Sequence, residues 1–469
     1  MTDFAARLQP DRGEPAHPIH VVDKDSAAKW LKRQPEARRS FLAAANFDGK
    51  KPGQFGILPG PGDAFEVVAA VADAAALTPW CLARLGDALA AGHYRLADGE
   101  VGAAALGWLL GQHRFTRYKS DDTPERGARI LLTTEAAEID RHVRLAAATA
   151  EVRDLVDTPA SDMGPAELEE AASRLAADHG AKLTVTAGDA LEQGYPMIAA
   201  VGQGATRERA PRLIELHWGN PKHPRIAIVG KGVCFDSGGL DIKPASGMRL
   251  MKKDMGGAAH ALALARLVMA ERLPVRLHLL IPAVENSVSA AAFRPGDVIA
   301  SRKGLSVEVD NTDAEGRLVL GDALTRAGEG DGEGRSPELI LDFATLTGAA
   351  RVALGPDLPA MFANDEDLAS ALETASTAAH DPLWRMPLWD GYDEMLKSDI
   401  ADLANAADSP LAGAVTAALF LRRFVPDGVA WAHFDTFAWR PSAKPGRPKG
   451  GEAMGLRAAF GMLNSRYQA

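Results

Sequence analysis

Residues 225–269 read RIAIVGKGVCFDSGGLDIKPASGMRLMKKDMGGAAHALALARLVM, and this stretch sets the expected fold. It opens with a short apolar run at 226–229, which is typical of a buried parallel strand, and a glycine-rich turn follows. Glycines let the backbone approach a bound group closely, and ligands of open α/β sheets bind outside the carboxyl ends of the strands. We therefore expect a ligand site directly after this strand.

Two groups of charged residues point to a metal site. After the apolar run, the spacing K-x4-D-x6-K-x10-D places Lys231, Asp236, Lys243 and Asp254. The octapeptide NTDAEGRL at 311–318 follows an apparent strand at 305–310. Alternate residues of an extended chain point the same way, so we expect Asp313, Glu315 and Arg317 to share one space. Such a cluster is costly to bury without a bound cation or anion, so the pattern predicts a metal site.

Each of these residues also has an ordinary structural interpretation when it is taken alone. An aspartate before a helix, such as Asp254, is commonly an N-cap, and a lone lysine is usually solvated. Asp313 and Glu315 can be turn acids with Arg317 as their ion-pair partner. The joint spacing favours the metal site over these separate interpretations. No histidine lies in an H-E-x-x-H motif, so we expect His260 and His433 to be structural.

Alternating apolar and helical segments predict an α/β protein with two domains. We expect a small N-terminal α/β domain at 1–133, a linker helix at 134–159 with Thr134 as its N-cap, and a larger α/β domain at 160–469. The larger domain should contain a mainly parallel central sheet with right-handed crossovers. Its expected strands are 182–186, 197–201, 213–217, 226–229, 275–281 and 339–343, and its expected helices include 257–271 and 318–327.

The composition is that of an ordinary globular protein, with 469 residues of which 46% are hydrophobic and 24% charged. The formal net charge of -10 does not favour nucleic acid as a partner. Two cysteines, Cys81 and Cys234, are too few for a disulfide framework. The first residues lack the apolar core of a secretory signal, and no apolar stretch reaches the length of a membrane span. We expect a cytoplasmic protein with no membrane partner.

Taken together, the motifs resemble those of the leucyl aminopeptidase family of dinuclear metallopeptidases. The resemblance covers roughly residues 153–457, and the octapeptide with the spaced lysines and aspartates is its most specific part. Further matching segments are RDLVDTPASDMGPAE at 153–167, PGD at 295–297, ATLTGA at 344–349, SDIADL at 398–403 and WAHFD at 431–435. The segment TFAWRP at 436–441 and the loop at 444–455 depart from the family pattern, and both bear on substrate preference.

The resemblance implies a metal-dependent aminopeptidase with two divalent ions per subunit, Zn or Mn being the expected metals. It implies that one ion is held by Lys231, Asp236, Asp254 and Glu315, and the other by Asp236, Asp313 and Glu315 with the Asp313 carbonyl. Lys243 resembles the catalytic lysine that contacts the substrate carbonyl, and Arg317 resembles the residue that holds a bicarbonate as general base. The residues that resemble the pocket for the first substrate side chain, with leucine-like or broad preference, are Met251, Thr345, Leu346 and Gly348. Peptide substrates and a homo-hexamer are also implied.

These residue types suit peptide hydrolysis. Paired metal ions acidify a bridging water and polarise the carbonyl, and bridging carboxylates such as Asp236 and Glu315 offset the repulsion between two cations. As a ligand, Lys231 must be neutral, whereas Lys243 should stay protonated where the oxyanion develops. Three alternatives stay open at this point: an aminopeptidase that also binds DNA as a regulator, a dipeptidase such as a cysteinyl-glycinase, and a catalytically silent scaffolding relative.

Overall fold

The computed structural model describes residues 2–62, 64–120, 127–330 and 335–468. The chain folds into two compact units. Unit 1 comprises Met1–Ala150 and Ser442–Lys449, and unit 2 comprises Glu151–Pro441 and Gly450–Ala469. The segment Ser442–Lys449 therefore clusters with unit 1, although it follows the larger unit in sequence.

Unit 1 is built on a six-stranded sheet in the order β1-β6-β5-β2-β4-β3. Its strand pairs are parallel except for the antiparallel pair β3–β4. The strands are β1 Leu8–Pro10, β2 His17–Val22, β3 Phe55–Pro59, β4 Phe65–Ala70, β5 Gly92–Leu96 and β6 Arg129–Thr133. The helices are α1 Ala27–Lys32, α2 Glu36–Ala44, α3 Ala83–Ala88 and α4 Ala104–Leu110, and α5 Ile139–Asp157 runs on into unit 2.

The central sheet of unit 2 has the order β16-β15-β18-β14-β9-β11-β8-β7, with β10 paired to β11. The central strands β18, β14, β9, β11 and β10 run parallel, and antiparallel pairs occur toward the edges. The strands are β7 Lys182–Ala187, β8 Arg212–Trp218, β9 Arg225–Gly230, β10 Gly232–Asp236, β11 Arg276–Asn286, β14 Leu339–Ala344, β15 Ala360–Ala363, β16 Trp384–Arg385 and β18 Ala430–Asp435. The predicted mainly parallel sheet is confirmed.

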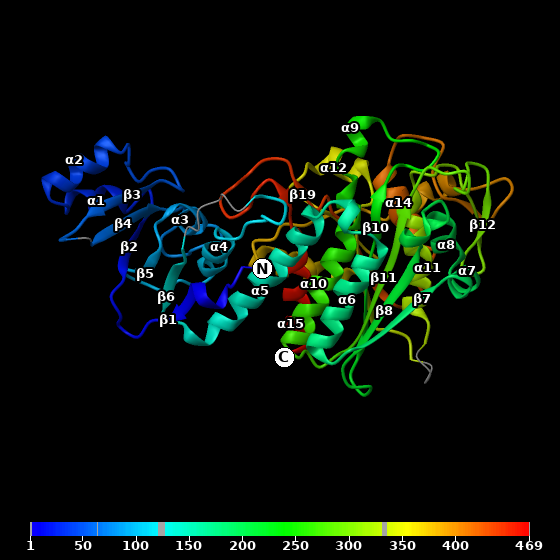
Figure 1. Ribbon diagram of the computed structural model, residues 1–469, viewed down its shortest axis with the longest axis horizontal. Helices are drawn as coiled ribbons and strands as arrows, with labels where there is room; N and C mark the ends of the chain where they lie inside the picture. Colours follow the sequence, from blue (N-terminus) through cyan, green and yellow to red (C-terminus); the bar gives the residue numbers. More distant parts are fainter. Residues whose placement is uncertain (1, 63, 121–126, 331–334, 469) are drawn as a thin grey trace. The chain divides into compact units, whose positions relative to one another are not determined.

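Helices cover both faces of this sheet, as Figure 1 shows. On one face lie α6 Pro165–His179, α10 Gly256–Ala270 and α15 Leu456–Tyr467, and on the other lie α8 Pro196–Gly202, α11 Glu315–Gly328 and α14 Gly413–Arg422. Ala227 and Val229 of β9 belong to the core formed with α8, α11 and α14. The alternate residues Ile226 and Ile228 are also buried. Burial on both faces explains why residues 226–229 of β9 are continuously apolar.

The remaining elements are α13 Glu366–Ala378, which has 13 residues, and a set of shorter helices and strands. The shorter helices are α7 Asp189–Gly194, α9 Ala245–Met248 and α12 Gly348–Leu354, together with the 3-10 turns Ala5–Arg7, Ala136–Glu138, Ala160–Asp162, Arg207–Arg209, Met251–Met255 and Asp390–Leu396. Two small sheets are formed by β12 Val298–Ala300, β13 Ser306–Glu308 and β17 Leu403–Ala404, and by β19 Trp439–Arg440 and β20 Gly450–Gly451.

Several predicted elements were wrong in kind or extent. Residues 197–201 form helix α8 instead of a strand, because Pro196 occupies its first turn and Asp322 accepts hydrogen bonds from Met197 N and Ile198 N. The linker helix α5 begins at Ile139, and Thr134 does not cap it. The strand expected at 305–310 is limited to β13, and the helix expected at 318–327 already begins at Glu315. This last difference matters for the charged octapeptide.

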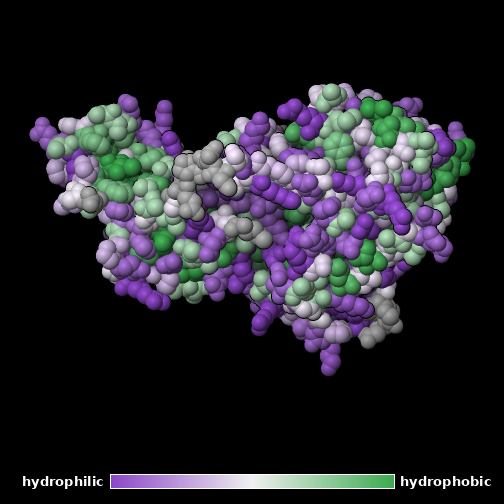
Figure 2. Space-filling view, in the orientation of Figure 1, coloured by the Kyte–Doolittle hydropathy of each residue, from purple (hydrophilic) through white to green (hydrophobic). Residues whose placement is uncertain are grey.

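Figure 2 shows a face of the molecule that mixes hydrophilic surface with separate hydrophobic patches. Among the described residues, no helix combines the length and apolar character that crossing a bilayer requires.

Candidate metal centre and active site

The predicted site residues gather at the carboxyl ends of the central parallel strands. Lys231 follows β9, Asp236 ends β10, Thr345 follows β14 and Asp435 ends β18. These residues line a cavity of about 500 Å³. The position agrees with the rule that ligands of α/β sheets bind beyond the carboxyl ends of the strands.

Three carboxylates from two chain segments meet in this cavity. Asp236, Asp313 and Glu315 each offer an oxygen, and these oxygens all lie within 4.8 Å of one another. The extended geometry expected for the octapeptide is wrong, because Asp313 lies in a turn and Glu315 is the first residue of α11. The positive end of the helix dipole faces Glu315, which favours a carboxylate there. The predicted convergence is therefore present, but a turn and a helix start produce it.

Lys231 forms ion pairs with Glu315 and with a fourth carboxylate, Asp254. Its Nζ lies 2.8 Å from Asp254 Oδ2 and 2.9 Å from Glu315 Oε1. Burial would lower the pKa of Lys231, but the carboxylates of Asp254 and Glu315 outweigh burial and raise it. Gly316 permits this approach, since a Cβ there would stand 2.7 Å from Lys231 Nζ. A divalent cation between the carboxylates would reverse the pKa shift and make the neutral amine available as a ligand.

Lys243 occupies a second position beside the cluster. Its Nζ lies 2.8 Å from Asp236 Oδ2 and also pairs with Asp313 Oδ1. Burial opposes the charged form, yet Asp236, Glu315 and Asp313 together raise the pKa of Lys243. Its side chain is 15% exposed, against 2% for Lys231, so Lys243 is the lysine within reach of a substrate in the cavity.

The carboxylate oxygens fit divalent cations. Asp254 Oδ2, Asp313 Oδ1 and Glu315 Oε1 are buried, and although each faces a lysine ammonium, none accepts a hydrogen bond of good geometry. Burial and the charge of Asp236 raise the pKa of Glu315 to about 8 and that of Asp313 to about 6. Buried, mutually repelling oxygens with unused lone pairs are the donors that hard divalent cations require.

Arg317 supplies a buried positive charge in the first turn of α11, two residues after Glu315. Its NH1 donates to the carbonyl of Asn405 at 2.8 Å, whereas its Nε is buried and has no hydrogen-bond partner. Burial lowers the pKa of Arg317 to about 10. A cavity-lining guanidinium with an unused donor fits a small anion such as bicarbonate.

Neutral residues that the sequence analysis did not single out hold the charged ones in place. Asn405 is completely buried, and its Oδ1 accepts from Asp310 N at 2.8 Å and Asn311 N at 3.1 Å. Asn286 Nδ2 donates to Asp236 Oδ1 at 2.9 Å and to the Thr312 carbonyl at 3.1 Å. An isolated asparagine carries no sequence signal of this role, since its partners are distant in sequence.

The residues predicted to bind the first substrate side chain also line the cavity. These residues are Met251, Thr345, Leu346 and Gly348. Thr345 has a second contact, because its Oγ1 donates to Asp254 Oδ1 at 2.7 Å. Gly348 leaves open space where a Cβ would stand. All eleven residues proposed from the sequence therefore lie around one cavity, with carboxylates and lysines at its base.

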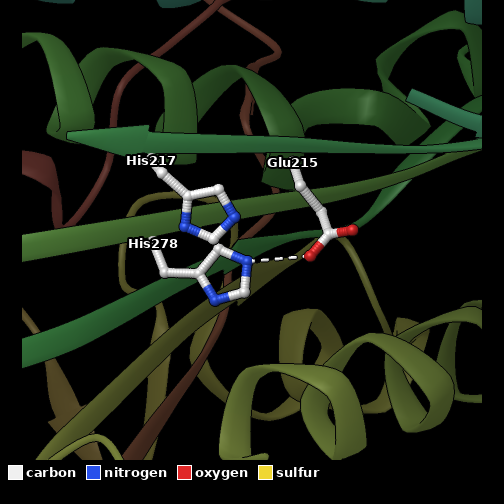
Figure 3. Close-up of side chains that lie close together, drawn as sticks. All are labelled: Glu215, His217 and His278. Carbon is white, nitrogen blue, oxygen red and sulfur yellow. Dashed lines mark hydrogen bonds and ion pairs between the residues drawn. The ribbon is translucent and has the colours of Figure 1, made fainter. Parts of the chain in front are cut away.

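A second group of possible metal ligands lies elsewhere on the sheet. Figure 3 shows the ring of His217 stacked on that of His278, with His278 bonded to Glu215. Arg225 can only donate to His278 Nδ1, at 3.1 Å, so His278 Nε2 carries the proton that reaches Glu215 Oε1 at 3.0 Å. Arg326 donates to the same Glu215 oxygen at 2.9 Å. Both nitrogens of His278 are engaged, and two guanidinium groups would repel a cation, so this cluster is an ion-pair network.

This network predicts acid sensitivity. Burial, partly offset by Glu215, lowers the pKa of His278 to about 4, from about 6.5 in an unfolded chain. Between about pH 6.5 and pH 4, His278 binds a proton in the unfolded chain but stays neutral in the folded chain. The free energy of unfolding should therefore fall as the pH decreases from about 6.5 to 4, by up to about 3 kcal/mol. Urea unfolding at several pH values should give a flatter profile for His278→Gln than for the wild type. Equal slopes would exclude His278 as the cause.

The fold and the cavity together define an α/β protein with a candidate site for divalent metal ions. Residues 150–460 match the model of the cytosol aminopeptidase family, catalytic domain, and residues 17–133 match that of the M17 aminopeptidase N-terminal domain. The chain belongs to the cytosol aminopeptidase family. The predicted resemblance to leucyl aminopeptidases is thereby confirmed.

Individual relatives agree with this assignment. A probable cytosol aminopeptidase of Syntrophotalea carbinolica is 43% identical over 373 residues, which cover 76% of this chain and 73% of the relative. The counterpart from Roseiflexus castenholzii is 43% identical over 388 residues, covering 79% and 78%. The crystal structure of the Coxiella burnetii cytosol aminopeptidase matches with a TM-score of 0.91 and 45% identity, covering 98% of this chain and 99% of that one. The bottromycin maturation enzyme BotP in complex with Mn matches at 0.86 and 31%, covering 96% and 100%.

The family fixes the general activity. The chain is a metal-dependent aminopeptidase, a hydrolase that removes residues from the amino end of peptides. The alternatives of a DNA-binding regulator, a cysteinyl-glycinase and a silent scaffold receive no support from these relatives.

Proposed function

We propose that this enzyme uses two divalent ions to hydrolyse the first peptide bond of substrates with leucine-like or varied amino-terminal residues. The proposed ligands are Lys231, Asp236, Asp254, Asp313 and Glu315. One observation carries the proposal: carboxylate oxygens of Asp236, Asp313 and Glu315 lie within 4.8 Å of one another. Lys231 pairs with Glu315, and Lys243 pairs with Asp236. Asp236 and Glu315 are suited to serve both ions.

Lys243 and Arg317 have separate proposed roles in the reaction. Two bound cations would supply an acidified water and a polarised peptide carbonyl. Lys243 stays protonated beside Asp236 and Asp313 and places positive charge where the oxyanion develops. Arg317 would hold a small anion, by proposal bicarbonate, which would supply a general base for the attacking water. The buried contact with Asn405 fixes the guanidinium for this task.

Substrate orientation follows from the cavity lining. We assign the first side chain to the region of Met251, Thr345, Leu346 and Gly348. Met251 is flexible and polarisable, so it adapts to side chains of different shape. Open space beside Gly348 supports the acceptance of a side chain as large as leucine.

Zinc or manganese is the proposed metal. The donor set is rich in oxygen, which suits Mn²⁺, and the lysine nitrogen extends it toward Zn²⁺. The similar enzyme BotP is known in complex with Mn. We further propose a cytoplasmic location, in keeping with the cytosolic designation of the relatives, and a homo-hexamer, in keeping with the family resemblance. Sedimentation analysis of the 49.6 kDa subunit tests the assembly.

Metal removal tests the proposed function. Dialysis against a chelator is expected to abolish cleavage of leucine p-nitroanilide, because both the water and the carbonyl lose their activating charge. Adding back Zn²⁺, Mn²⁺, Co²⁺ or Mg²⁺ separately should restore activity to different extents and rank the metals. Elemental analysis must accompany each assay. Full activity in protein shown to be metal-free would disprove the mechanism.

A further inference from the structure

The cavity has a cationic wall beside its carboxylate base. Lys253 and Arg351 both line the cavity, and both lie over the ring of Phe437. Lys253 Nζ is 5.5 Å and Arg351 Cζ is 4.8 Å from the ring centroid. Phe437 belongs to the segment 436–441, which departs from the family pattern.

The wall lies where the first side chain is proposed to bind. Lys253 comes two residues after Met251, within the same 3-10 turn. Arg351 belongs to α12, the helix that begins at Gly348. An incoming side chain that packs against Met251 and Gly348 therefore meets the ring of Phe437 and the two cations that flank it.

Both cations retain capacity to bind an anion. Lys253 has a side chain only 6% exposed, and its single hydrogen bond, to Asp254 Oδ1, is long at 3.3 Å. An ammonium has three donors, so two remain. Within the described part of the chain, Arg351 has no carboxylate within 4.0 Å.

Asp435, two residues before Phe437, does not neutralise this wall. Asp435 Oδ1 accepts from Leu346 N at 2.9 Å and from Thr347 N at 3.2 Å, and its Oδ2 accepts from Thr347 Oγ1 at 2.5 Å. These bonds turn the Asp435 carboxylate toward the loop after β14. Asp435 is therefore engaged elsewhere, and Arg351 keeps its positive charge without a carboxylate partner among the described residues.

We infer that this pocket selects acidic over basic amino-terminal residues, with Lys253 and Arg351 as its specificity-determining residues. The inference rests on the proposed binding of the first side chain in this cavity. A glutamate or aspartate side chain gains charge-assisted hydrogen bonds from the exposed Arg351 and from Lys253, whose side chain is only 6% exposed. A lysine or arginine side chain meets like charge and loses hydration. Leucine and methionine still pack on Phe437 and Met251.

Matched substrates test this selection. Glutamyl and glutaminyl p-nitroanilides have nearly the same shape and differ in charge, so the ratio of their kcat/KM values isolates the charge effect. Wild-type enzyme loaded with its metal is expected to favour the glutamyl substrate about tenfold, and a lysyl substrate should be the slowest. Leucine p-nitroanilide reports the reaction itself, so loss of leucine cleavage in metal-loaded enzyme would count against the proposed function and not against this inference.

Variants assign the effect to residues. Arg351→Met and Lys253→Met should each lower the glutamyl-to-glutaminyl ratio at least threefold. Arg351 lies on an exposed part of α12, so Arg351→Met is expected to fold. It tests the inference even if Lys253→Met fails to fold. Lys252→Met is the matched control, since Lys252 lies over Trp439, does not line the cavity and should leave the ratio unchanged. A wild-type ratio of one or below, or a ratio unchanged in Arg351→Met, would overturn the inference.

Discussion

Glu315→Gln is expected to lower kcat/KM for leucine p-nitroanilide by about three orders of magnitude. The carboxylate is proposed to serve both cations, and its loss removes several kcal/mol of transition-state stabilisation that the metals provide. Glutamine keeps the size of the side chain but offers one neutral oxygen. Elemental analysis after gel filtration should therefore find less bound metal as well as less activity.

Loss of folding would be a separate explanation for the lost activity, and stability measurements test it. In metal-free protein, burial and Asp236 raise the pKa of Glu315 to about 8, so ionised Glu315 destabilises the folded state as the pH rises from about 4.5 through 8. Glu315→Gln removes that penalty. Its metal-free melting temperature at pH 8 should equal or exceed the wild-type value. Glu373→Gln, on the exposed side of α13, serves as control and should change neither activity nor metal content. A stable, fully active Glu315→Gln enzyme would refute the ligand assignment.

The octapeptide illustrates what a local pattern can and cannot specify. The sequence identified Asp313, Glu315 and Arg317 as neighbours in space, and they are. It assigned them to extended chain, because five residues are too few to separate a period of two from the first turn of a helix. The structure places Glu315 at the start of α11 instead. The functional conclusion survived because both geometries bring these charges together.

Long-range partners set the limit of prediction elsewhere in unit 2. The apolar residues 197–201 are compatible with a strand, and only the carboxylate of Asp322, far along the chain, favours helix α8. In the same way, no pattern in the sequence around Asn405 indicates that its side chain accepts hydrogen bonds from the backbone of Asp310 and Asn311. By contrast, Lys231 could be placed from sequence, since it directly follows the continuously apolar run 226–229. The strand β10, which ends at Asp236, was not predicted, because its residues were interpreted as part of a glycine-rich turn.

Lys243→Met is expected to lower kcat by about 10²- to 10³-fold, with a smaller change in KM. Lysine and methionine side chains are similar in length, so the variant removes mainly the positive charge at the developing oxyanion. Single donors of this kind contribute roughly 3 to 4 kcal/mol in other enzymes. Lys243→Arg keeps the charge and should recover part of the rate. Lys397→Met, at an exposed surface lysine, is the control and should behave as wild type.

The metal content of Lys243→Met separates its role from that of Glu315. Lys243 pairs with Asp236 and Asp313, so its removal leaves these two carboxylates with less competing positive charge. Divalent cations should then bind as tightly as in wild type or more tightly, although turnover is slow. Glu315→Gln should instead lose metal and activity together. If Lys243→Met also lost its metal, or kept kcat within threefold of wild type, Lys243 would be a structural counter-ion and the stabilising charge at the oxyanion would have to come from another group.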